Sequence, residues 1–461
     1  MHAVTQPLEQ EQYAKPPYAW AVVAMLMLAS LVSYIDRQVV AIVVAPMKLD
    51  LGISDTQVGW IYGIFAIFYA VAGVPLAWLA DRKSRKTLIA LGVFFWSVMT
   101  MACGLVRSFP QILLARIGVG VGEATLVPSA NSLISDYFPR SQIPFAVSVF
   151  QTASVLGSAI AFIVGGFVLG LVQRAEEPLL PILAGLSPWQ QLFIYVGAPG
   201  LLLAPLMLSI REPRRRHAGA KPGVPFKEVV AFYRRNRTTI LLHHLGFLSL
   251  SLMGFGFVFW TVSFFTRVHG VEASVASQNF GWIFLLAGSF GSVCAAALAV
   301  RLGRRGVKDA NIVAAMIGAG LNIPMVLLVQ VMPSAGWAYL LYIPAMLTST
   351  SPFGLAYGSL PVIAPPQMRA VVVSIFMFVI SLGMLLGPPV TGFFNERLFP
   401  EVDGIRYSLG SVTLLFGGIG LVLLNLCRKH YARSLAEADA LAAAAETSAD
   451  AVVKANEVRP S

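Results

Sequence analysis

Charged side chains are scarce in this sequence of 461 residues: Asp, Glu, Lys and Arg make up 12% of it, whereas an ordinary soluble domain holds roughly 25%. Hydrophobic residues make up 57%, and the mean hydropathy is +0.74. This composition excludes a soluble globular protein and indicates a membrane protein. The net charge of +11 does not indicate nucleic acid, because Lys and Arg lie in short runs between apolar segments, where they orient a protein in a bilayer. We expect membrane lipids, and no nucleic acid, as partners.

Residues that build disulfides and metal sites are also few. Cys103, Cys294 and Cys427 are widely spaced in apolar surroundings, so no disulfide framework or metal site follows. The consecutive His243 and His244 point to different sides of a helix and make a poor pair of metal ligands. No cluster of a nucleophile and a base is visible. We therefore predict that the protein is not an enzyme and holds no metal or cofactor, with a proton as the candidate coupling ion.

Long apolar stretches are abundant, and twelve of them reach the ~20 residues that a membrane-spanning helix needs. They lie near residues 19–46, 56–80, 87–106, 109–135, 144–172, 190–210, 239–266, 276–300, 309–331, 335–363, 370–394 and 406–428. The first follows a polar tail without a basic region, so we interpret it as a retained helix and not a signal peptide. The sequence predicts an all-α membrane protein with twelve transmembrane helices in two bundles of six.

Basic residues mark the cytoplasmic side. They collect in the connections after the second, sixth and eighth stretches, for example in "DRKSRK" (81–86), which places both termini in the cytoplasm; in a bacterium the membrane would be the plasma (inner) membrane. We expect a surface-lying helix over "PFKEVVAFYRR" in the long basic connection. The predicted division begins with a cytoplasmic N-terminal tail (1–18) and a six-helix bundle (19–210). A basic cytoplasmic linker (211–238), a second six-helix bundle (239–428) and a cytoplasmic C-terminal tail (429–461) follow.

The two halves of the chain repeat each other at a shift of 226 residues, at which Pro139 meets Pro365. In the same register "GSAIAFIVGG" (157–166) meets "GMLLGPPVTG" (383–392). Two six-helix halves indicate a transporter with its site at their interface near the bilayer midplane. Glycine and proline let helices pack closely and bend, and the predicted helix-packing positions are Gly157, Gly165, Gly166, Gly383, Gly387 and Pro388.

Few charges lie inside the predicted membrane helices, and such charges are costly unless they have a function. The first helix carries Asp36 and Arg37, and the fourth carries Arg116 and Glu123. At ~1.5 Å per residue their depths are similar enough for all four to meet if the two helices adjoin. We predict that these four residues form a substrate or proton site; a static salt bridge between helices is the alternative. Glu123 is the expected proton carrier, because Asp36 has Arg37 as a fixed neighbour and separating a buried carboxylate from its arginine favours proton uptake.

Two motifs resemble those of the major facilitator superfamily: "LADRKSRK" (79–86) and "LLARIGVGVGE" (113–123). More narrowly, "YIDR" (34–37) together with "RIGVGVGEA" (116–124) is similar to the spinster family of lipid and sphingolipid transporters. The resemblance implies that the first and fourth helices adjoin and that the bundles rock in alternating access. It further implies a cytoplasmic gate that joins the two bundles, made of Asp81, Arg82, Arg85, Lys86 and Asp136.

The predicted membrane helices of the second half lack charges in their central stretches but are rich in aromatic residues, as in "GFGFVFWTVSFF" (254–265). This asymmetry favours a small amphipathic substrate, with an anionic or zwitterionic head near Arg37 and an alkyl chain on the aromatic wall, unless the aromatics face lipid. With the resemblance, it predicts a monomeric secondary transporter of the lysolipid or sphingoid phosphate class, with proton coupling. The alternatives are an organic-anion/proton symporter of the same superfamily, since similar motifs occur there, and a membrane lipid sensor.

Overall fold

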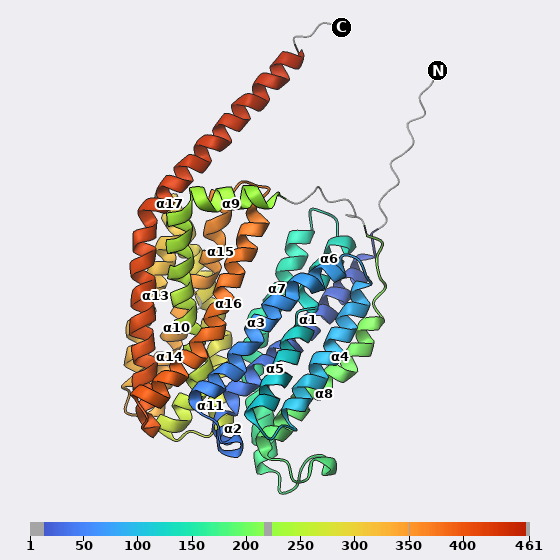
Figure 1. The fold of residues 1–461 in the computed structure, drawn as a ribbon, viewed down its shortest axis with the longest axis vertical. Coiled ribbons are helices and arrows are strands. Elements are labelled where there is room, and N and C mark those ends of the chain that lie inside the picture. Colours follow the sequence, from blue (N-terminus) through green and yellow to red (C-terminus); the bar gives the residue numbers. More distant parts are fainter. Residues whose placement is uncertain (1–12, 216–223, 350, 458–461) are drawn as a thin grey trace. The chain divides into compact units, whose positions relative to one another are not determined.

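A computed structural model of the protein describes residues 13–215, 224–349 and 351–457 (Figure 1). Its long elements are all helices, and the described residues contain no β-strand. The predicted all-α fold is confirmed. Parts of both predicted tails and of the predicted linker lie outside the described residues, at 1–12, 216–223 and 458–461.

Contacts between helices divide the chain into two compact units. The first unit is Met1–Val39 with Phe68–Lys221, and the second unit is Val40–Ile67 with Pro222–Ser461. Two helices, α1 (Pro16–Ile42) and α3 (Asp55–Ala80), therefore begin in one unit and end in the other. The sequence-based bundle boundaries stay a prediction.

The first unit is packed around one helix, α4. Besides parts of α1 and α3, the unit contains α4 (Arg85–Cys103), α5 (Phe109–Glu123), α6 (Leu126–Tyr137), α7 (Ile143–Arg174), the short η1 (Pro181–Leu183) and α8 (Pro188–Leu208). α4 lies along α5 and α8. Glycine makes this possible, because a Cβ at Gly122 would lie only 2.8 Å from the Cβ of Trp96.

The second unit is arranged around α10, which lies along α16 and α17. Its helices are α2 (Val44–Leu51), α9 (Phe226–Arg235), α10 (Arg237–His269), α11 (Ala273–Ile283), α12 (Ser289–Arg304), α13 (Ala310–Gln330), α14 (Ala335–Ser349), α15 (Ser351–Ile363), α16 (Arg369–Phe393) and α17 (Ile405–Glu457), with π-helical turns at Phe284–Gly288 and Phe394–Leu398 and a 3₁₀ turn at Val402–Gly404. The helix predicted within the basic connection is present as α9.

Eleven helices in the described part of the chain are long and apolar enough to cross a membrane. The remaining predicted stretch, 335–363, is formed by α14 and α15 on either side of residue 350, which is not described. The fourth predicted stretch forms two helices, α5 and α6, which are separated by a short turn directly after Glu123. Irregular backbone at membrane depth is typical of places where a helix lines a site.

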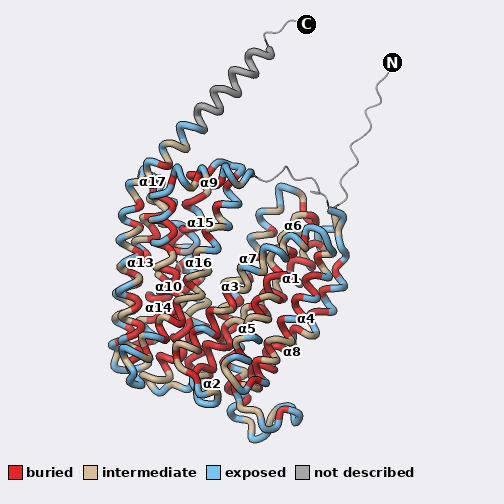
Figure 2. The backbone as a smooth tube through the Cα atoms, viewed as in Figure 1, coloured by how far each residue is buried: buried red, intermediate tan, exposed pale blue. Residues whose placement is uncertain are grey.

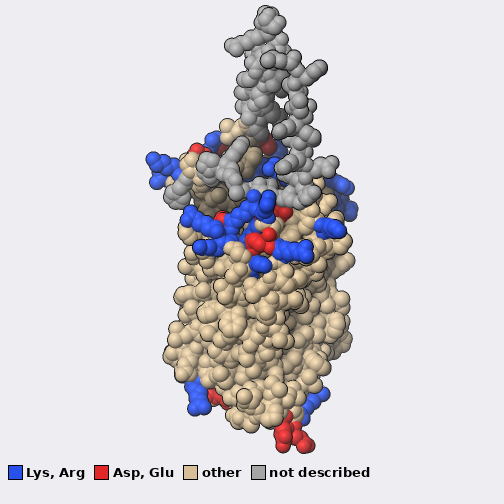
Figure 3. Space-filling model, turned by 90° about the vertical axis from the view of Figure 1, so that its right-hand side faces the viewer, with Lys and Arg blue, Asp and Glu red and all other residues tan. Residues whose placement is uncertain are grey.

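The burial pattern is that of a membrane protein. Buried residues lie between the helices of each unit (Figure 2), while large apolar side chains such as Leu202 and Phe290 are exposed on the outside. On the face shown in Figure 3, charged side chains lie near the ends and leave a wide band without Lys, Arg, Asp or Glu. Such a band fits the hydrocarbon layer of a bilayer.

Two predicted packing glycines lie where α16 meets α10. A Cβ at Gly387 would lie 2.5 Å from the backbone oxygen of Leu252, and one at Gly383 would overlap the side chain of Ser251. The carbonyl of Pro388 accepts a hydrogen bond from Nε1 of Trp260 at 2.9 Å. Gly165 and Gly166 of α7 are buried.

We expect Gly387→Ala to lower the thermal unfolding temperature in detergent, because backbone atoms have to move to admit the methyl group. The expected loss is about 1–3 kcal/mol of unfolding free energy. Gly320→Ala in α13 is the matched control, since no atom lies within 4 Å of the Cβ it would add. Equal unfolding temperatures for the two variants would contradict the close packing of α16 on α10.

Candidate functional site

The four charged residues predicted from the sequence meet in the first unit, between α1 and α5. Arg116 donates from Nη1 to the backbone oxygen of Asp36 at 2.9 Å, and Arg37 donates from Nε to Oε2 of Glu123 at 2.7 Å. Asp36 and Arg116 are 0% exposed and Glu123 is 1% exposed. The structure therefore brings the predicted residues together as one cluster that joins the two helices.

Glu123 is held by α1 through two side chains. Ser33 donates its hydroxyl to Oε2 at 2.5 Å, and Arg37 binds the same oxygen. Ser33 and Arg37 are four residues apart and so lie on one face of α1, where Nη2 of Arg37 also reaches the Ser33 hydroxyl at 3.3 Å. Oε1 of Glu123 has no hydrogen-bond partner within the described residues. Glu123 is also the last residue of α5, so its position depends on where that helix ends.

Asp36 has a different environment. Neither carboxylate oxygen has a hydrogen-bond partner within the described residues, although the Thr100 hydroxyl and the charges of Arg116, Glu123 and Arg37 lie around it. Arg37, which the sequence predicts as a fixed neighbour of Asp36, forms its ion pair with Glu123 on α5. Successive residues on a helix point in directions about 100° apart, so Arg37 turns away from Asp36 and toward Glu123.

Arg37 is the most accessible member of the cluster, with 13% of its side chain exposed. Its Cζ lies 4.6 Å from the ring centroid of Tyr34 and 4.8 Å from that of Tyr69. A guanidinium beside aromatic rings is stabilised by their electron-rich faces. Ser33, Tyr34 and Tyr69 are site residues that the sequence-based prediction does not include. Helical spacing could have indicated the first two, since they precede Arg37 by four and three residues and so lie on the same face of α1. Tyr69 comes from α3, and no spacing relates it to Arg37.

A second polar cluster lies in the first unit at the start of α4. Arg85 is 1% exposed and forms ion pairs with Asp136 of α6 and with Glu212, the latter at 2.7 Å. Glu212 also accepts from the backbone N–H of Arg85 at 3.2 Å and of Lys86 at 3.1 Å, so it caps the start of α4. Sequence analysis missed Glu212, which looked like one more acid in a basic connection.

The other residues of the predicted cytoplasmic gate have separate partners. The guanidinium of Arg82 lies 3.7 Å from the ring centroid of Trp78, and Nζ of Lys86 donates to the backbone oxygen of Leu208 at 3.0 Å. Asp81 is exposed and forms no ion pair within the described residues. Thus Arg85 and Asp136 are joined and Asp81 stands apart, while the role of these residues as a gate stays a prediction.

The second unit holds an ion cluster that the sequence analysis did not consider. Asp55, the first residue of α3, accepts two hydrogen bonds from Arg267 of α10, at 2.6 and 2.8 Å, and forms an ion pair with Lys48 of α2. Next to it, the Thr56 hydroxyl donates to Glu396 at 2.7 Å. These contacts tie the segment 40–67 to α10 and to the end of α16. Two residues 212 positions apart leave no sequence signal for such a pair.

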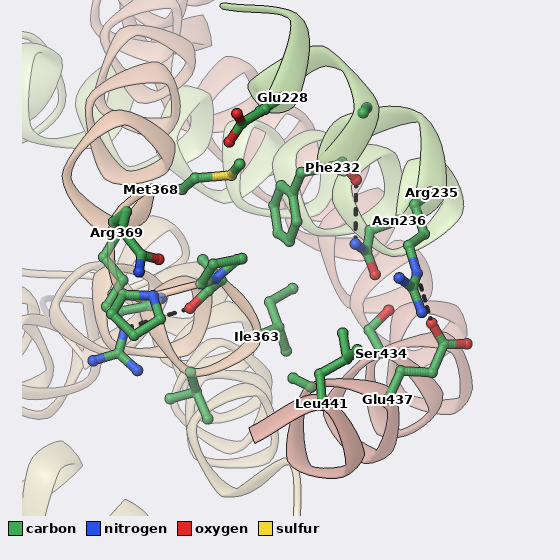
Figure 4. A pocket seen from close by; sticks show the side chains of 18 of the residues that line it. Glu228, Phe232, Arg235, Asn236, Ile363, Met368, Arg369, Ser434, Glu437 and Leu441 are labelled. Atoms are coloured by element: carbon green, nitrogen blue, oxygen red, sulfur yellow. Dashed lines mark hydrogen bonds and ion pairs between the residues drawn. The ribbon is translucent and has the colours of Figure 1, made fainter. Parts of the chain in front are cut away.

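A cavity of about 1000 Å³ lies in the second unit between α9, the connection from α15 to α16, and α17. The side chains of Phe232, Ile363, Met368 and Leu441 surround it, and the ion pair of Arg235 with Glu437, at 3.2 Å, lies on one side (Figure 4). None of the predicted site residues lines this cavity.

Comparison with known proteins assigns the family. A sequence profile described as Major Facilitator Superfamily matches residues 26–388. The chain belongs to the major facilitator superfamily. A solved bacterial homologue of the human lysosomal transporter spinster, in an inward-facing and unoccupied conformation, has a TM-score of 0.79 and 27% identity to this chain, covering 91% of it and 99% of the homologue. The resemblance to the spinster family is confirmed.

Two curated relatives in this superfamily differ in their described roles. The chain is 27% identical over 435 residues to an MFS-type efflux pump of Mycolicibacterium smegmatis. This match covers 92% of the chain and 95% of the pump. It is 31% identical over 183 residues to a probable L-galactonate transporter of Escherichia coli. This match covers 39% of the chain and 37% of that transporter. This member of the major facilitator superfamily is thus a multi-pass membrane transporter related to spinster.

The contacts of Glu212 make the stability of the folded protein depend on pH. Burial raises the pKa of Glu212, but hydrogen bonds from the Arg85 guanidinium and from the backbone N–H groups of Lys86 and Arg85 lower it more, so that this pKa lies below its usual value. The ordinary glutamate pKa is about 4.3. The stability that Glu212 contributes is therefore present above that pH and is lost as the pH falls through the lower, folded-state pKa.

We expect Glu212→Gln to destabilise the transporter by about 1 kcal/mol at pH 7, because the start of α4 loses a charged cap. The difference from the wild type should shrink as the pH falls below about 4.3. Thermal unfolding between pH 7 and about 3, below the ordinary glutamate pKa of about 4.3, tests this, with Glu176→Gln, an exposed acid in another connection, as the control. A difference that grows toward low pH would contradict the assignment.

Proposed function

We propose that this transporter moves a small amphipathic, lipid-like substrate of the lysolipid or sphingoid phosphate class, and that Arg37 binds its anionic head group. The observation that carries the proposal is the accessibility of Arg37 within a cluster whose other three charges are buried. A guanidinium binds the oxygens of a phosphate or carboxylate through several N–H groups at once. An entering anion reaches Arg37 before it reaches any other charge of the cluster.

Proton coupling follows from competition for Arg37. Oε2 of Glu123 accepts a hydrogen bond from Nε of Arg37 at 2.7 Å. An anionic head group that takes over Arg37 would leave Glu123 buried without its cation, which is unfavourable for a carboxylate and favours proton uptake. Asp36, whose carboxylate has no hydrogen-bond partner within the described residues, is the second group that we propose to carry a proton. Both carboxylates, and not Glu123 alone, thus belong to the proposed proton site.

Alternating access supplies the transport cycle of this proposal. Within the second unit, the Asp55–Arg267 contact joins the start of α3 to α10. Within the first unit, the Arg85 cluster holds the start of α4. We also propose that both termini lie in the cytoplasm, because the basic residues collect in the connections on the same side as the termini. A monomer suffices for this cycle.

An organic-anion/proton symporter is the second candidate, and the similarity to the probable L-galactonate transporter favours it. Its substrate would be small and hydrophilic, without an alkyl chain. A membrane lipid sensor is the third candidate. It would bind lipid in detergent but give no flux in vesicles.

Flux into proteoliposomes with lysolipids, sphingoid phosphates and small organic acids, at two pH values, distinguishes these functions. For the preferred substrate we expect Arg37→Ala to raise KM by about tenfold or more, because a charge-assisted contact to the head group is lost. Arg107→Ala, an exposed arginine in another connection, should behave as the wild type. Unchanged KM and head-group preference in Arg37→Ala would exclude the proposed head-group site.

A second experiment addresses the proton. In the wild type, a pH gradient across the vesicle should drive uptake, and we expect Asp36→Asn to abolish this drive while substrate exchange without a gradient continues. Glu123→Gln should weaken the drive and also lower substrate selectivity, since it changes the partner of Arg37. Asp403→Asn, an exposed acid, is the control. Gradient-driven uptake at wild-type rates in both Asp36→Asn and Glu123→Gln would refute proton coupling through this cluster.

A further inference from the structure

Aromatic rings on two different helices lie beside the guanidinium of Arg37. Tyr34 lies one helical turn before Arg37 on α1, and Tyr69 lies on α3. The two ring centroids are 4.6 and 4.8 Å from the Cζ of Arg37, which is within the ~6 Å range of a cation–π contact. Glu123 and Ser33 also accept hydrogen bonds from the guanidinium, so four side chains contact it, and 13% of the Arg37 side chain is exposed.

Tyr34 has its own neighbour, the backbone of α7 at Gly157. A Cβ added to Gly157 would lie 2.8 Å from the Cβ of Tyr34 and 3.1 Å from its Cγ and Cδ2. These atoms form the base of the side chain, not a flexible end, so a rotation of the outer ring does not relieve the overlap. Rotation of the Tyr34 side chain leaves its Cβ in place, so α1 and α7 have to move apart, and this shifts Tyr34 and Arg37 together relative to Glu123 on α5 and Tyr69 on α3.

We propose that Gly157 and Tyr34 are positioning residues for Arg37 and thereby determine recognition of the substrate head group. The missing side chain at 157 lets α7 support Tyr34, Tyr34 orients Arg37, and Arg37, whose side chain is 13% exposed, binds the anionic head. This inference rests on the proposed function, because it assigns the head group to Arg37. It gives Gly157, which the sequence marks as a packing glycine, a role in selecting the ligand.

The chemistry of the ligand follows from the guanidinium. An uncharged head group gains no charge-assisted contact from the guanidinium, whereas an anion with two oxygens can accept hydrogen bonds from it through both oxygens. Phosphate and carboxylate heads share this chemistry, so the test compares them. A neutral head group of similar size should not depend on the position of Arg37.

The test measures KM and maximal rate for an anionic lysolipid, a matched small carboxylate and a neutral-headed analogue in proteoliposomes. We expect Tyr34→Leu and Gly157→Ala each to raise KM for the anionic substrate about five- to tenfold, as for loss of a partly desolvated cation–π contact. The maximal rate and the KM of the neutral analogue should change little. Tyr34→Phe keeps the ring and should keep the wild-type KM, and Gly320→Ala is the control for adding a methyl group to a helix.

A double variant separates positioning from packing. If Gly157 acts through Tyr34, Gly157→Ala should raise KM little further in a protein that already carries Tyr34→Gly, which removes the Cβ that the new methyl group would meet. Equal increases in KM for anionic and neutral substrates would overturn the inference, as would wild-type KM in Tyr34→Leu. If Arg37→Ala raises KM but Tyr34→Leu does not, the inference fails and the proposed function stands; if Arg37→Ala has no effect, the proposed function itself fails.

Discussion

The buried ion pair between Arg37 and Glu123 constrains the first unit more than any other contact at the site. Removing one partner would strand the other charge in an apolar interior, where an uncompensated ion is strongly destabilising. α1 and α5 must therefore keep their register, and the end of α5 at Glu123 must stay where Ser33 and Arg37 reach it. The accessible part of Arg37 exists because this pair leaves the guanidinium at the edge of the cluster.

The two arginines of the cluster have different tasks. Arg116 is fully buried and reaches a backbone oxygen of α1, so it fixes the helix at Asp36 without neutralising the carboxylate by a direct hydrogen bond. Arg37 binds a carboxylate and lies beside two rings. Arg116 thus contacts the main chain of α1, whereas Arg37 pairs with a carboxylate and is the more exposed of the two. This division also explains why two acids in one cluster need not carry the same role.

Sequence alone predicted most of the fold, since the helices depend on length and apolarity, which hydropathy measures directly. It also found the four intramembrane charges, because charge is rare in such helices. It did not predict which charges pair. The side-chain directions of Asp36 and Arg37 depend on the neighbouring α5. The pairing of Arg37 with Glu123 therefore depends on tertiary packing, not on local sequence. Partners such as Tyr69, Glu212 and Arg267 come from distant segments and leave no periodic signal near the residues they contact.

The contact of α3 with α16 in the second unit has a consequence for how residues 40–67 can move. A Cβ at Gly59 would lie 2.6 Å from the backbone carbon of Pro388, and one at Gly392 would lie 2.6 Å from that of Asp55, so main chain meets main chain with no side chain between. Dispersion attraction at such a contact falls steeply, and a gap of about 0.5–1 Å already loses roughly a quarter to a half of it. A slightly opened contact therefore keeps little of its attraction and admits no water to replace it. The close fit of the two main chains therefore holds residues 40–67 firmly against α16.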